Sequence, residues 1–260
     1  MPHRRVLITR PKEQAAVWVQ ALRARGLDAQ ALPLIDIDSV EDLAPLRAAW
    51  SQVADYELVM FVSANAVAHF FAARGVLQPW PAHTVAGSTG PGTTGALRAA
   101  GLAEHHIVEP APGATLDSES LWMRLRQREW SGKRALIVRG EEGRDWLAET
   151  LRAAGADVSF LAAYRRLPPR LDLEGRALLA QALAHPTRHC WVFSSSQAVR
   201  HLQALTQDWP SPPRMSGTAL VPHPRIAQSA SEAGFDQVQV IEPGLGPLEA
   251  AVVALESKAQ

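Results

Sequence analysis

Apolar and polar residues alternate along this chain on two length scales. Short apolar runs, typical of buried strands, are separated by longer stretches in which apolar residues recur at helical spacing. The predicted strands are Val6–Ile8, Leu58–Val62, Ala135–Val138, Cys190–Phe193 and Val238–Ile241, and the predicted helices are Gln14–Arg25, Asn65–Arg74, Thr93–Ala100, Asp145–Ala154, Gln197–Leu205 and Ile226–Ala233. This alternation predicts the α/β class, with parallel sheets covered by helices on both faces.

Two further patterns refine these elements. A glycine follows four of the predicted helices, where a left-handed C-cap is needed: Gly26, Gly101, Gly155 and Gly234. The stretches Asp28–Asp38 and Asp157–Leu167 each run about ten residues, which is longer than the mean strand. We interpret them as two long strands that cross between domains.

The sequence also contains an internal repeat. Four blocks recur in the same order at an offset of about 130 residues, a period far too long for a solenoid. Among the matches, Leu7, Arg10 and Gly26 return as Leu136, Arg139 and Gly155; Phe61, Ser63 and His69 return as Phe193, Ser195 and His201; Pro91 and Glu109 return as Pro224 and Glu242. The repeat predicts two copies of one domain with a small-molecule site in the cleft between them. It leaves open whether each domain is continuous or whether the copies exchange halves.

Composition restricts the classes of function. The 260 residues carry a formal net charge of zero, which argues against a nucleic-acid or acidic-membrane binder. Arginine far outnumbers lysine, which occurs only at Lys12, Lys133 and Lys258, and guanidinium groups suit carboxylate or phosphate ligands. Cys190 is the single cysteine and the histidines lack metal-ligand spacing, so we expect neither a disulfide nor a metal site. The absence of a signal-peptide pattern and of a membrane-spanning run predicts a cytoplasmic protein.

Candidate binding residues follow the predicted strands, because ligands of open parallel sheets lie beyond the carboxyl ends of the strands. Serine, threonine and asparagine in such places are most often helix N-caps, but the free helix amides beside them also attract anions. The candidates are Arg10 and its copy Arg139, Ser63, Ala64 and Asn65, their copies Ser195, Ser196 and Gln197, and Thr93 in the loop Gly87–Thr94. That glycine-rich loop lacks both the P-loop ending and the dinucleotide-binding spacing.

Tyr164 closes the second long strand, beside Arg165 and Arg166. A tyrosine in this place either packs as a half-buried side chain or offers a functional hydroxyl, and the residue pattern leaves both interpretations open.

Taken in order, these motifs resemble those of the uroporphyrinogen-III synthase family. The resemblance covers nearly the whole chain and rests on Ile8–Pro11, Pro33–Ile37, Val62–Val67, Gly90–Thr93, Gly143-Arg144 with Leu147, Val158–Arg165, Phe193–Ser196 and Pro224–Ala227. It implies two flavodoxin-like parallel-sheet domains joined by a two-stranded linker. One domain would combine residues 1–37 with 165–260, and the other would span 38–164.

The resemblance also implies a reaction. The enzyme would close the linear tetrapyrrole hydroxymethylbilane to uroporphyrinogen III in haem biosynthesis, with inversion of ring D and loss of water, as a hydro-lyase without cofactor. Because ionisation of the hydroxymethyl group gives a resonance-stabilised cation, orientation of the substrate would matter more than strong acid–base catalysis. A flavodoxin-like two-domain protein that binds a nucleotide or anion without this activity is the alternative.

The family pattern assigns roles to two residues. Tyr164 matches a tyrosine proposed to assist departure of the hydroxyl group, and Thr93 matches a threonine that lines the substrate loop. Ile226 stands at the corresponding place in the second copy, so the threonine is not duplicated. We further expect a monomer that binds neither nucleic acid nor membrane, with room for a transient contact with the preceding pathway enzyme.

Overall fold

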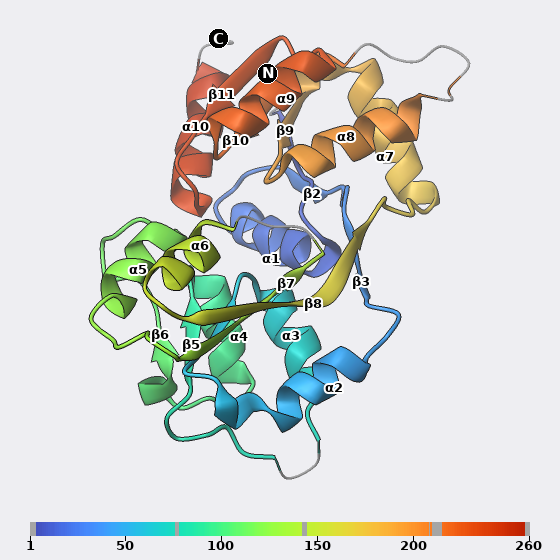
Figure 1. Cartoon of the computed structure of the whole chain (residues 1–260). Coiled ribbons are helices and arrows are strands. Elements are labelled where there is room, and N and C mark those ends of the chain that lie inside the picture. Colours follow the sequence, from blue (N-terminus) through green and yellow to red (C-terminus); the bar gives the residue numbers. More distant parts are fainter. Residues whose placement is uncertain (1–3, 76–77, 142–144, 208, 210–214, 258–260) are drawn as a thin grey trace. The chain divides into compact units, whose positions relative to one another are not determined.

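The computed structural model describes residues 4–75, 78–141, 145–207, 209 and 215–257 (Figure 1). The chain divides into two compact units, Met1–Asp36 with Leu167–Gln260, and Ile37–Arg166. It therefore passes from one unit to the other twice, after Asp36 and after Arg166. Independent folding of two domains with the bounds 1–37 plus 165–260 and 38–164 stays a prediction.

The first unit contains a parallel sheet in the order β11-β10-β9-β1-β2. Its apolar strands pack against α1 and α10 through side chains such as Ile8, Leu22 and Leu248. The strands are β1 (Arg5–Ile8), β2 (Ala29–Ala31), β9 (His189–Val192), β10 (Thr218–Val221) and β11 (Gln237–Val240); the helices are α1 (Lys12–Arg23), α7 (Leu173–Ala184), α8 (Ser196–Thr206), α9 (Pro224–Ala233) and α10 (Leu245–Ser257).

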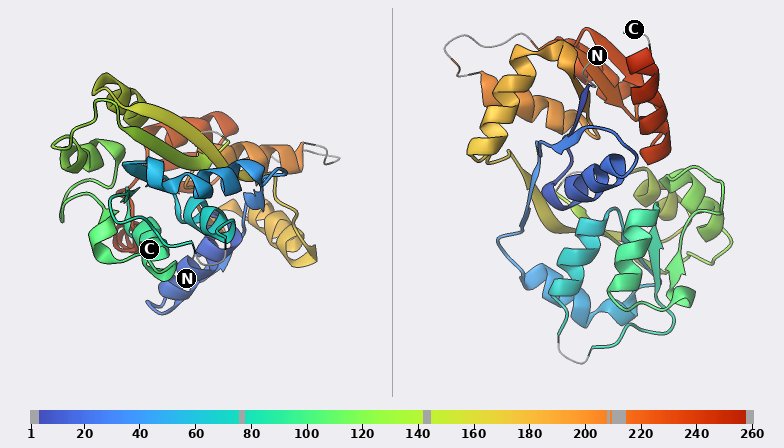
Figure 2. Two further views of the ribbon diagram at one scale, coloured as in Figure 1. Left: turned by 60° about the horizontal axis from the view of Figure 1, so that its bottom comes forward. Right: turned by 180° about the vertical axis from the view of Figure 1, so that it is seen from behind.

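The second unit contains a sheet in the order β3-β8-β7-β4-β5-β6, which is parallel from β8 to β6. Helices α2, α3 and α4 contribute to the core on one face, and α5 and α6 to the core on the other. The strands are β3 (Asp36–Ser39), β4 (Leu58–Phe61), β5 (Val85–Ser88), β6 (Ile107–Val108), β7 (Arg134–Gly140) and β8 (Asp157–Leu167); the helices are α2 (Ala44–Ser51), α3 (Ala64–Ala72), α4 (Pro91–Ala99), α5 (Ser118–Leu125) and α6 (Trp146–Ala153). Figure 2 shows α3 and α4 side by side, and the two helices are in contact.

Each sheet combines strands from both copies of the repeat. The first sheet joins β1 and β2 of the first copy to β9, β10 and β11 of the second, and the second sheet joins β4, β5 and β6 to β7 and β8. Numbered within the repeat, the first sheet has the strand order 2-1-3-4-5 of flavodoxin-like folds, and the second has the same order with β3 added at its edge beside β8. The α/β class with parallel sheets is confirmed, and the copies exchange halves, a point that the repeat alone leaves open.

One predicted strand is wrong. Asp28–Asp38 is not continuous: β2 ends at Ala31 and β3 begins at Asp36, whereas the copy Asp157–Leu167 forms the single strand β8. Pro33 lies in the break, and its nitrogen has no hydrogen to donate to a neighbouring strand. Leu32 and Leu34 on either side are fully buried and hydrogen-bonded to β1 and its continuation, so the segment is anchored although it is not a strand.

The glycine-terminated helices are confirmed. Gly26, Gly101, Gly155 and Gly234 have φ values of 82°, 90°, 96° and 110°, in the left-handed region that favours glycine.

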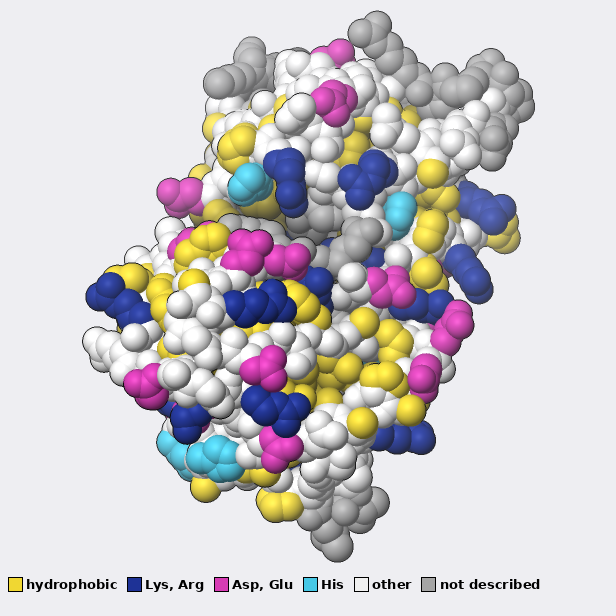
Figure 3. Space-filling model, in the orientation of Figure 1, with side chains coloured by type: hydrophobic (Ala, Val, Ile, Leu, Met, Phe, Trp, Pro, Cys, Tyr) yellow, Lys and Arg dark blue, Asp and Glu magenta, His cyan; other side chains and the backbone are white. Residues whose placement is uncertain are grey.

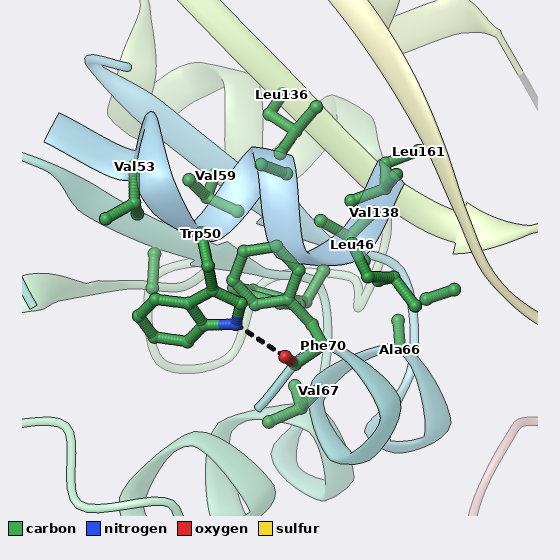
Figure 4. Packing of buried hydrophobic residues seen from close by; sticks show 14 of the residues in the cluster. Leu46, Trp50, Val53, Val59, Ala66, Val67, Phe70, Leu136, Val138 and Leu161 are labelled. Carbon is green, nitrogen blue, oxygen red and sulfur yellow. Dashed lines mark hydrogen bonds between the residues drawn. The ribbon is translucent and has the colours of Figure 1, made fainter. Parts of the chain in front are cut away.

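A cluster of buried side chains fixes α3 in place. Trp50 of α2 donates a hydrogen bond of 2.5 Å from Nε1 to the Phe70 carbonyl oxygen, and its ring lies 4.9 Å from that of Phe70 (Figure 4). Ala66 and Val67 on the same helix belong to the same cluster as Val59 and Val138 of the sheet. This packing sets the position of the first turn of α3, which follows the end of β4.

Candidate functional site

In each sheet, successive strands along the chain are added first toward one edge and then toward the other. The point where the order reverses is called the reversal point below. In the second unit this point lies between β7 and β4, and in the first unit between β1 and β9. Ligands of open α/β sheets bind beyond the carboxyl ends of the strands at such a point. Gly140 and Ser63 lie at or just after the carboxyl ends of β7 and β4 in the second unit. Arg10 and Ser195 lie just after the carboxyl ends of β1 and β9 in the first.

Tyr164 lies at the reversal point of the second unit. The residue is 1% exposed, and its Oη accepts hydrogen bonds from Ser63 Oγ at 3.1 Å and from Arg166 Nη2 at 3.3 Å. The sequence predicts Tyr164 and Ser63 as separate candidates, far apart along the chain, and the structure brings them into contact. Arg166 is a neighbour that the sequence does not predict as a site residue.

A β-bulge and a glycine make room for the phenol ring. Arg139 pairs with Ala162 but Gly140 pairs with Tyr164, so the register shifts by one residue between them. A Cβ atom on Gly140 would lie 3.1 Å from Tyr164 Cε2 and 3.2 Å from Cζ. The missing side chain therefore allows the backbone of β7 to approach the ring closely.

His69 of α3 also packs against the phenol. The imidazole and phenol rings are 5.9 Å apart and 25° from parallel, and Nδ1 is 3.4 Å from Ser39 Oγ. Burial lowers the pKa of His69, and the carboxylate of Asp38 acts in the opposite direction. The neutral imidazole is therefore favoured near pH 7.

The first turn of α3 presents main-chain donors at this point. Ser63 is the N-cap, and its Oγ accepts from the Ala66 amide at 3.2 Å. The half-buried Ala64 and Asn65 follow in the first turn, where amides have no partner within the helix. Because the helix dipole favours negative charge there, the turn is suited to a carboxylate.

Arg139 faces away from Tyr164. It lies two residues after Ile137, which belongs to the core on the opposite face from Tyr164. Its Nη1 pairs with Asp145 Oδ1, and its guanidinium carbon lies 3.9 Å from the ring centroid of Phe160. These contacts separate Arg139 from the other predicted residues of this unit.

Thr93 lies in the first turn of α4 and is buried. Its neighbour Thr94 belongs to a chain of hydrogen bonds that the sequence does not reveal: Ser88 Oγ is 2.6 Å from Thr94 Oγ1, which donates to Glu109 Oε2 at 2.7 Å. This chain ties the loop after β5 to the residue that follows β6. It also places a carboxylate beside the glycine-rich loop.

In the first unit, Arg10 is held at the end of β1. Its guanidinium carbon lies 4.1 Å above the Trp18 ring, and Nη1 is 3.4 Å from Gln14 Oε1. Within the described part of the chain, its buried Nε has no hydrogen-bond partner. Burial lowers the pKa of Arg10, so an anion at this position would compensate for a desolvated cation.

The serine-rich loop after β9 repeats the geometry of Ser63. Ser195 is the N-cap of α8, and its Oγ accepts from the Ala198 amide at 3.3 Å. Ser196 Oγ lies 3.5 Å from the Arg225 carbonyl oxygen, and Gln197 follows in the first turn. The repeat places Ile35 where the second copy has Tyr164, and Ile35 is a buried apolar residue, so the phenol has no repeat-related counterpart.

Metal sites and membrane-spanning helices were also considered. Among the described residues, no group of three His, Cys, Asp or Glu side chains could hold a metal ion, and no helix has the length and apolar character needed to cross a membrane. The motif Gly143-Arg144 lies outside the residues that the structure describes. Basic and acidic side chains are interspersed on the face shown in Figure 3.

Comparison with known proteins agrees with this geometry. A family model described as uroporphyrinogen-III synthase HemD matches residues 16–245. Uroporphyrinogen-III synthase of Salmonella typhimurium (strain LT2) is 31% identical over 245 residues, which cover 91% of this chain and 94% of the relative, and that of Escherichia coli (strain K12) is 29% identical with the same coverage.

Solved structures show the same fold. A mutant uroporphyrinogen III synthase of Thermus thermophilus gives a TM-score of 0.56 at 19% identity and covers 98% of this chain and 99% of that one. Uroporphyrinogen-III synthetase of Helicobacter pylori 26695 gives 0.56 at 17% identity, with 99% and 100% covered. From the match to the family model and to the curated relatives, the chain belongs to the uroporphyrinogen-III synthase family.

Proposed function

We propose that this protein converts hydroxymethylbilane to uroporphyrinogen III, with inversion of ring D and loss of water, in tetrapyrrole (haem) biosynthesis. Membership of the family supports this activity. The observation that carries it in the structure is the Tyr164 phenol, buried at the strand-order reversal with two protein donors on its oxygen. Such a phenol can donate its own hydrogen to a departing hydroxyl group.

The proposed reaction needs few acid–base groups in the site. Loss of the hydroxyl gives a cation stabilised by the pyrrole, and the ring then bonds through its substituted carbon before rearrangement. Correct placement of the reacting carbons decides which isomer forms, so positioning supplies much of the catalysis. Water is lost without net oxidation or reduction, so the chemistry requires no redox cofactor, and the proposed enzyme acts without one.

We assign the substrate carboxylates to the strand-end loops. The first turns of α3 and α8, at Ser63, Ala64 and Asn65 and at Ser195, Ser196 and Gln197, offer amides and hydroxyls to them. Arg10 offers an under-partnered guanidinium, and Thr93 lines the loop after β5. Arg139 is the weakest member of the predicted set, because Asp145 already neutralises it.

The nucleotide-binding alternative is less well supported. A phosphate bound at Gly87–Thr94 would meet the carboxylate of Glu109, which accepts a hydrogen bond from Thr94 at 2.7 Å. The negative charge of Glu109 beside this loop opposes the binding of a phosphate there. A monomeric state, a cytoplasmic location and a transient contact with the preceding enzyme also belong to the proposal, and sedimentation of the purified protein tests the first.

The activity is tested by incubation with freshly prepared hydroxymethylbilane, followed by oxidation and separation of the porphyrin isomers. We expect isomer III in excess over an enzyme-free control, which closes without inversion to isomer I. Isomer I alone at all protein concentrations would refute the proposed function.

A further inference from the structure

Arg166 contacts the oxygen of the Tyr164 phenol. It lies two residues after Tyr164 on β8, so the two side chains start from the same face of the strand. Its Nη2 donates to Tyr164 Oη at 3.3 Å, and its guanidinium carbon is 5.8 Å from the ring centroid. The neighbouring Arg165 instead pairs with Asp38 and Glu41.

Counting donors and acceptors fixes the role of the phenol hydrogen. A tyrosine oxygen carries one hydrogen to donate, and an arginine side chain can only donate. Ser63 Oγ accepts from the Ala66 amide and donates its own hydrogen to Tyr164 Oη. Both groups therefore donate to the phenol oxygen, and neither of them uses the phenol hydrogen.

We propose that Arg166 is a positioning residue for the loss of water: with Ser63, it holds the Tyr164 phenol as a donor and stabilises the charge that develops on its oxygen. This inference rests on the proposed function. It adds a residue to the site, because the sequence pattern singles out Tyr164 without Arg166.

In the dehydration step, the C–O bond of the hydroxymethyl group breaks, and its electron pair leaves with the oxygen. The phenol hydrogen moves to that oxygen, so water departs, a cation remains on the substrate and a negative charge remains on Tyr164 Oη. The N–H of Arg166 and the O–H of Ser63 then face a phenolate, to which charge-assisted hydrogen bonds are stronger. When the ring closes and a carbon-bound hydrogen is lost as a proton, Tyr164 recovers its hydrogen.

A double-mutant cycle tests the inference. Arg166→Met removes the donor and the charge but keeps most of the length of the side chain, and we expect kcat to fall about tenfold, the size of one net hydrogen bond, with little change in KM. In the Tyr164→Phe background the same change should alter kcat by less than about twofold, because the phenol oxygen is absent. Full activity in Arg166→Met, or an equal tenfold loss in both backgrounds, would overturn the proposal.

Two controls separate this role from a structural one. Arg126→Met removes another exposed arginine of the same unit and should leave kcat unchanged. Arg166→Lys keeps a cationic donor and should recover part of the lost rate. The solvent deuterium isotope effect on kcat should rise in Arg166→Met as proton transfer becomes more rate-limiting, and return toward the wild-type value in Arg166→Lys. An isotope effect unchanged in Arg166→Met would count against the proposal.

A measurement without substrate keeps the two proposals distinguishable. Cζ-labelled tyrosine gives one carbon resonance each for Tyr56 and Tyr164, and Tyr164→Phe assigns them. Arg166→Met should move the Tyr164 resonance and not that of Tyr56; an unmoved resonance refutes the contact. If the wild type forms only isomer I, the proposed function fails and the dehydration role fails with it. If it forms isomer III and Arg166→Met equals it, only the role of Arg166 fails.

Discussion

Single residues distinguish the two repeat-related strand ends. Tyr164, Gly140 and Asp145 of the second copy stand where the first copy has Ile35, Pro11 and Ala16. The second unit therefore has a phenol at its reversal point and an arginine neutralised by a carboxylate. The first unit has a packed apolar side chain and an arginine, Arg10, whose buried Nε lacks a partner in the described part of the chain. In the proposed reaction, the second copy thus carries the reacting group, and the first carries the charge that suits a carboxylate.

Gly140→Ala tests how finely the phenol is placed. The new Cβ would lie 3.1 and 3.2 Å from two ring carbons, closer than most such contacts, so the ring must shift slightly and its hydrogen bond to Ser63 should be disturbed. We expect kcat to fall about tenfold or more because small displacements of a reacting group are costly. Stability should fall by about 1–3 kcal/mol, as for other overpacked sites.

Steady-state kinetics and urea unfolding measure both effects. Gly95→Ala is the matched control, because a Cβ on that glycine of α4 meets no atom within 4 Å. Equal kcat in the two variants would show that the phenol tolerates the displacement.

Two histidines, the half-buried His69 and the buried His189, predict how stability depends on pH. Burial is the largest cause that lowers the pKa of His69, and also that of His189, below the ordinary value of 6.5. The unfolded chain then binds more protons than the folded chain as the pH falls through that value. The free energy of unfolding should therefore decrease between about pH 7 and pH 5. Urea unfolding across this range measures the decrease.

Neighbouring groups also act on the pKa values of these two histidines, so the control must remove the histidines themselves. Asp38 raises the pKa of His69; the His185 carbonyl and Asp28 raise that of His189, while Arg5 and His185 lower it. The double variant His69→Gln/His189→Gln should show a flatter dependence than the wild type. An equally steep decrease in that variant would assign the effect to carboxyl groups instead.

At the scale of helices, the starts of α3 and α8 differ from those of α4 and α9. The latter two begin with Pro91 and Pro224, which have no amide hydrogen, whereas α3 and α8 begin with Ala64 and Ser196, which do. Those two helices also follow the strands at the reversal points. The helix starts best placed to bind an anion therefore keep their first amide.

Ala64→Pro and Ser196→Pro test this difference. Proline is well tolerated at the first helical position, and the preceding residues Ser63 and Ser195 have the extended backbone that proline requires, so stability should change little. Each variant should raise KM about tenfold or more, since a hydrogen bond to a carboxylate is lost.

The control for these two variants is Ser195→Ala, which removes a cap but no amide and should change KM less. Steady-state kinetics measure KM in all three. Unchanged KM in both proline variants would show that these amides do not bind the substrate.

The sequence predicts elements well where a local pattern determines them. The strands with continuous apolar runs and the helices that end at glycine lie within a few residues of their predicted bounds. Helices α2, α5, α7 and α10 are missed. The apolar residues of α7 and α10 are spread around the helix instead of forming one stripe, and α2 and α5 are short helices of 8 residues each. Pro33 interrupts the segment Asp28–Asp38 and is a local signal against a continuous strand. The prediction of one long strand gives more weight to the repeat match with β8.

The candidate site can be predicted only in part, for a physical reason. Loop residues after strands are found because strand ends can be recognised along the chain. The contacts of Tyr164 with Ser63, Gly140 and His69 depend on which strands are neighbours and on a bulge in β8, which no local pattern specifies. The orientation of Arg139 toward Asp145 and Phe160 likewise follows from the strand face.

At the scale of the whole molecule, the exchange of halves makes the two units unequal in continuity. Residues 36–167 contain all strands of the second sheet, whereas residues 1–130 contain β1 and β2 without β9, and β4 to β6 without β7. We expect the fragment 36–167 to fold cooperatively and the fragment 1–130 not to, because neither of its partial sheets can bury its apolar strands. Circular dichroism during urea titration measures cooperativity; a sharp transition in 1–130 would contradict this reasoning.

The same exchange sets an order of events during synthesis. The second unit is complete when Arg166 has been added, but β1 and β2, which ends at Ala31, must wait for β9, which begins at His189. At translation rates of about 5–20 residues per second, this delay is roughly 8–30 s. During that time β1 and β2 have only each other as partners in their sheet, and the other edge of β1 lacks β9. The nascent chain is therefore most in need of chaperone protection at its oldest end, while its middle is already folded.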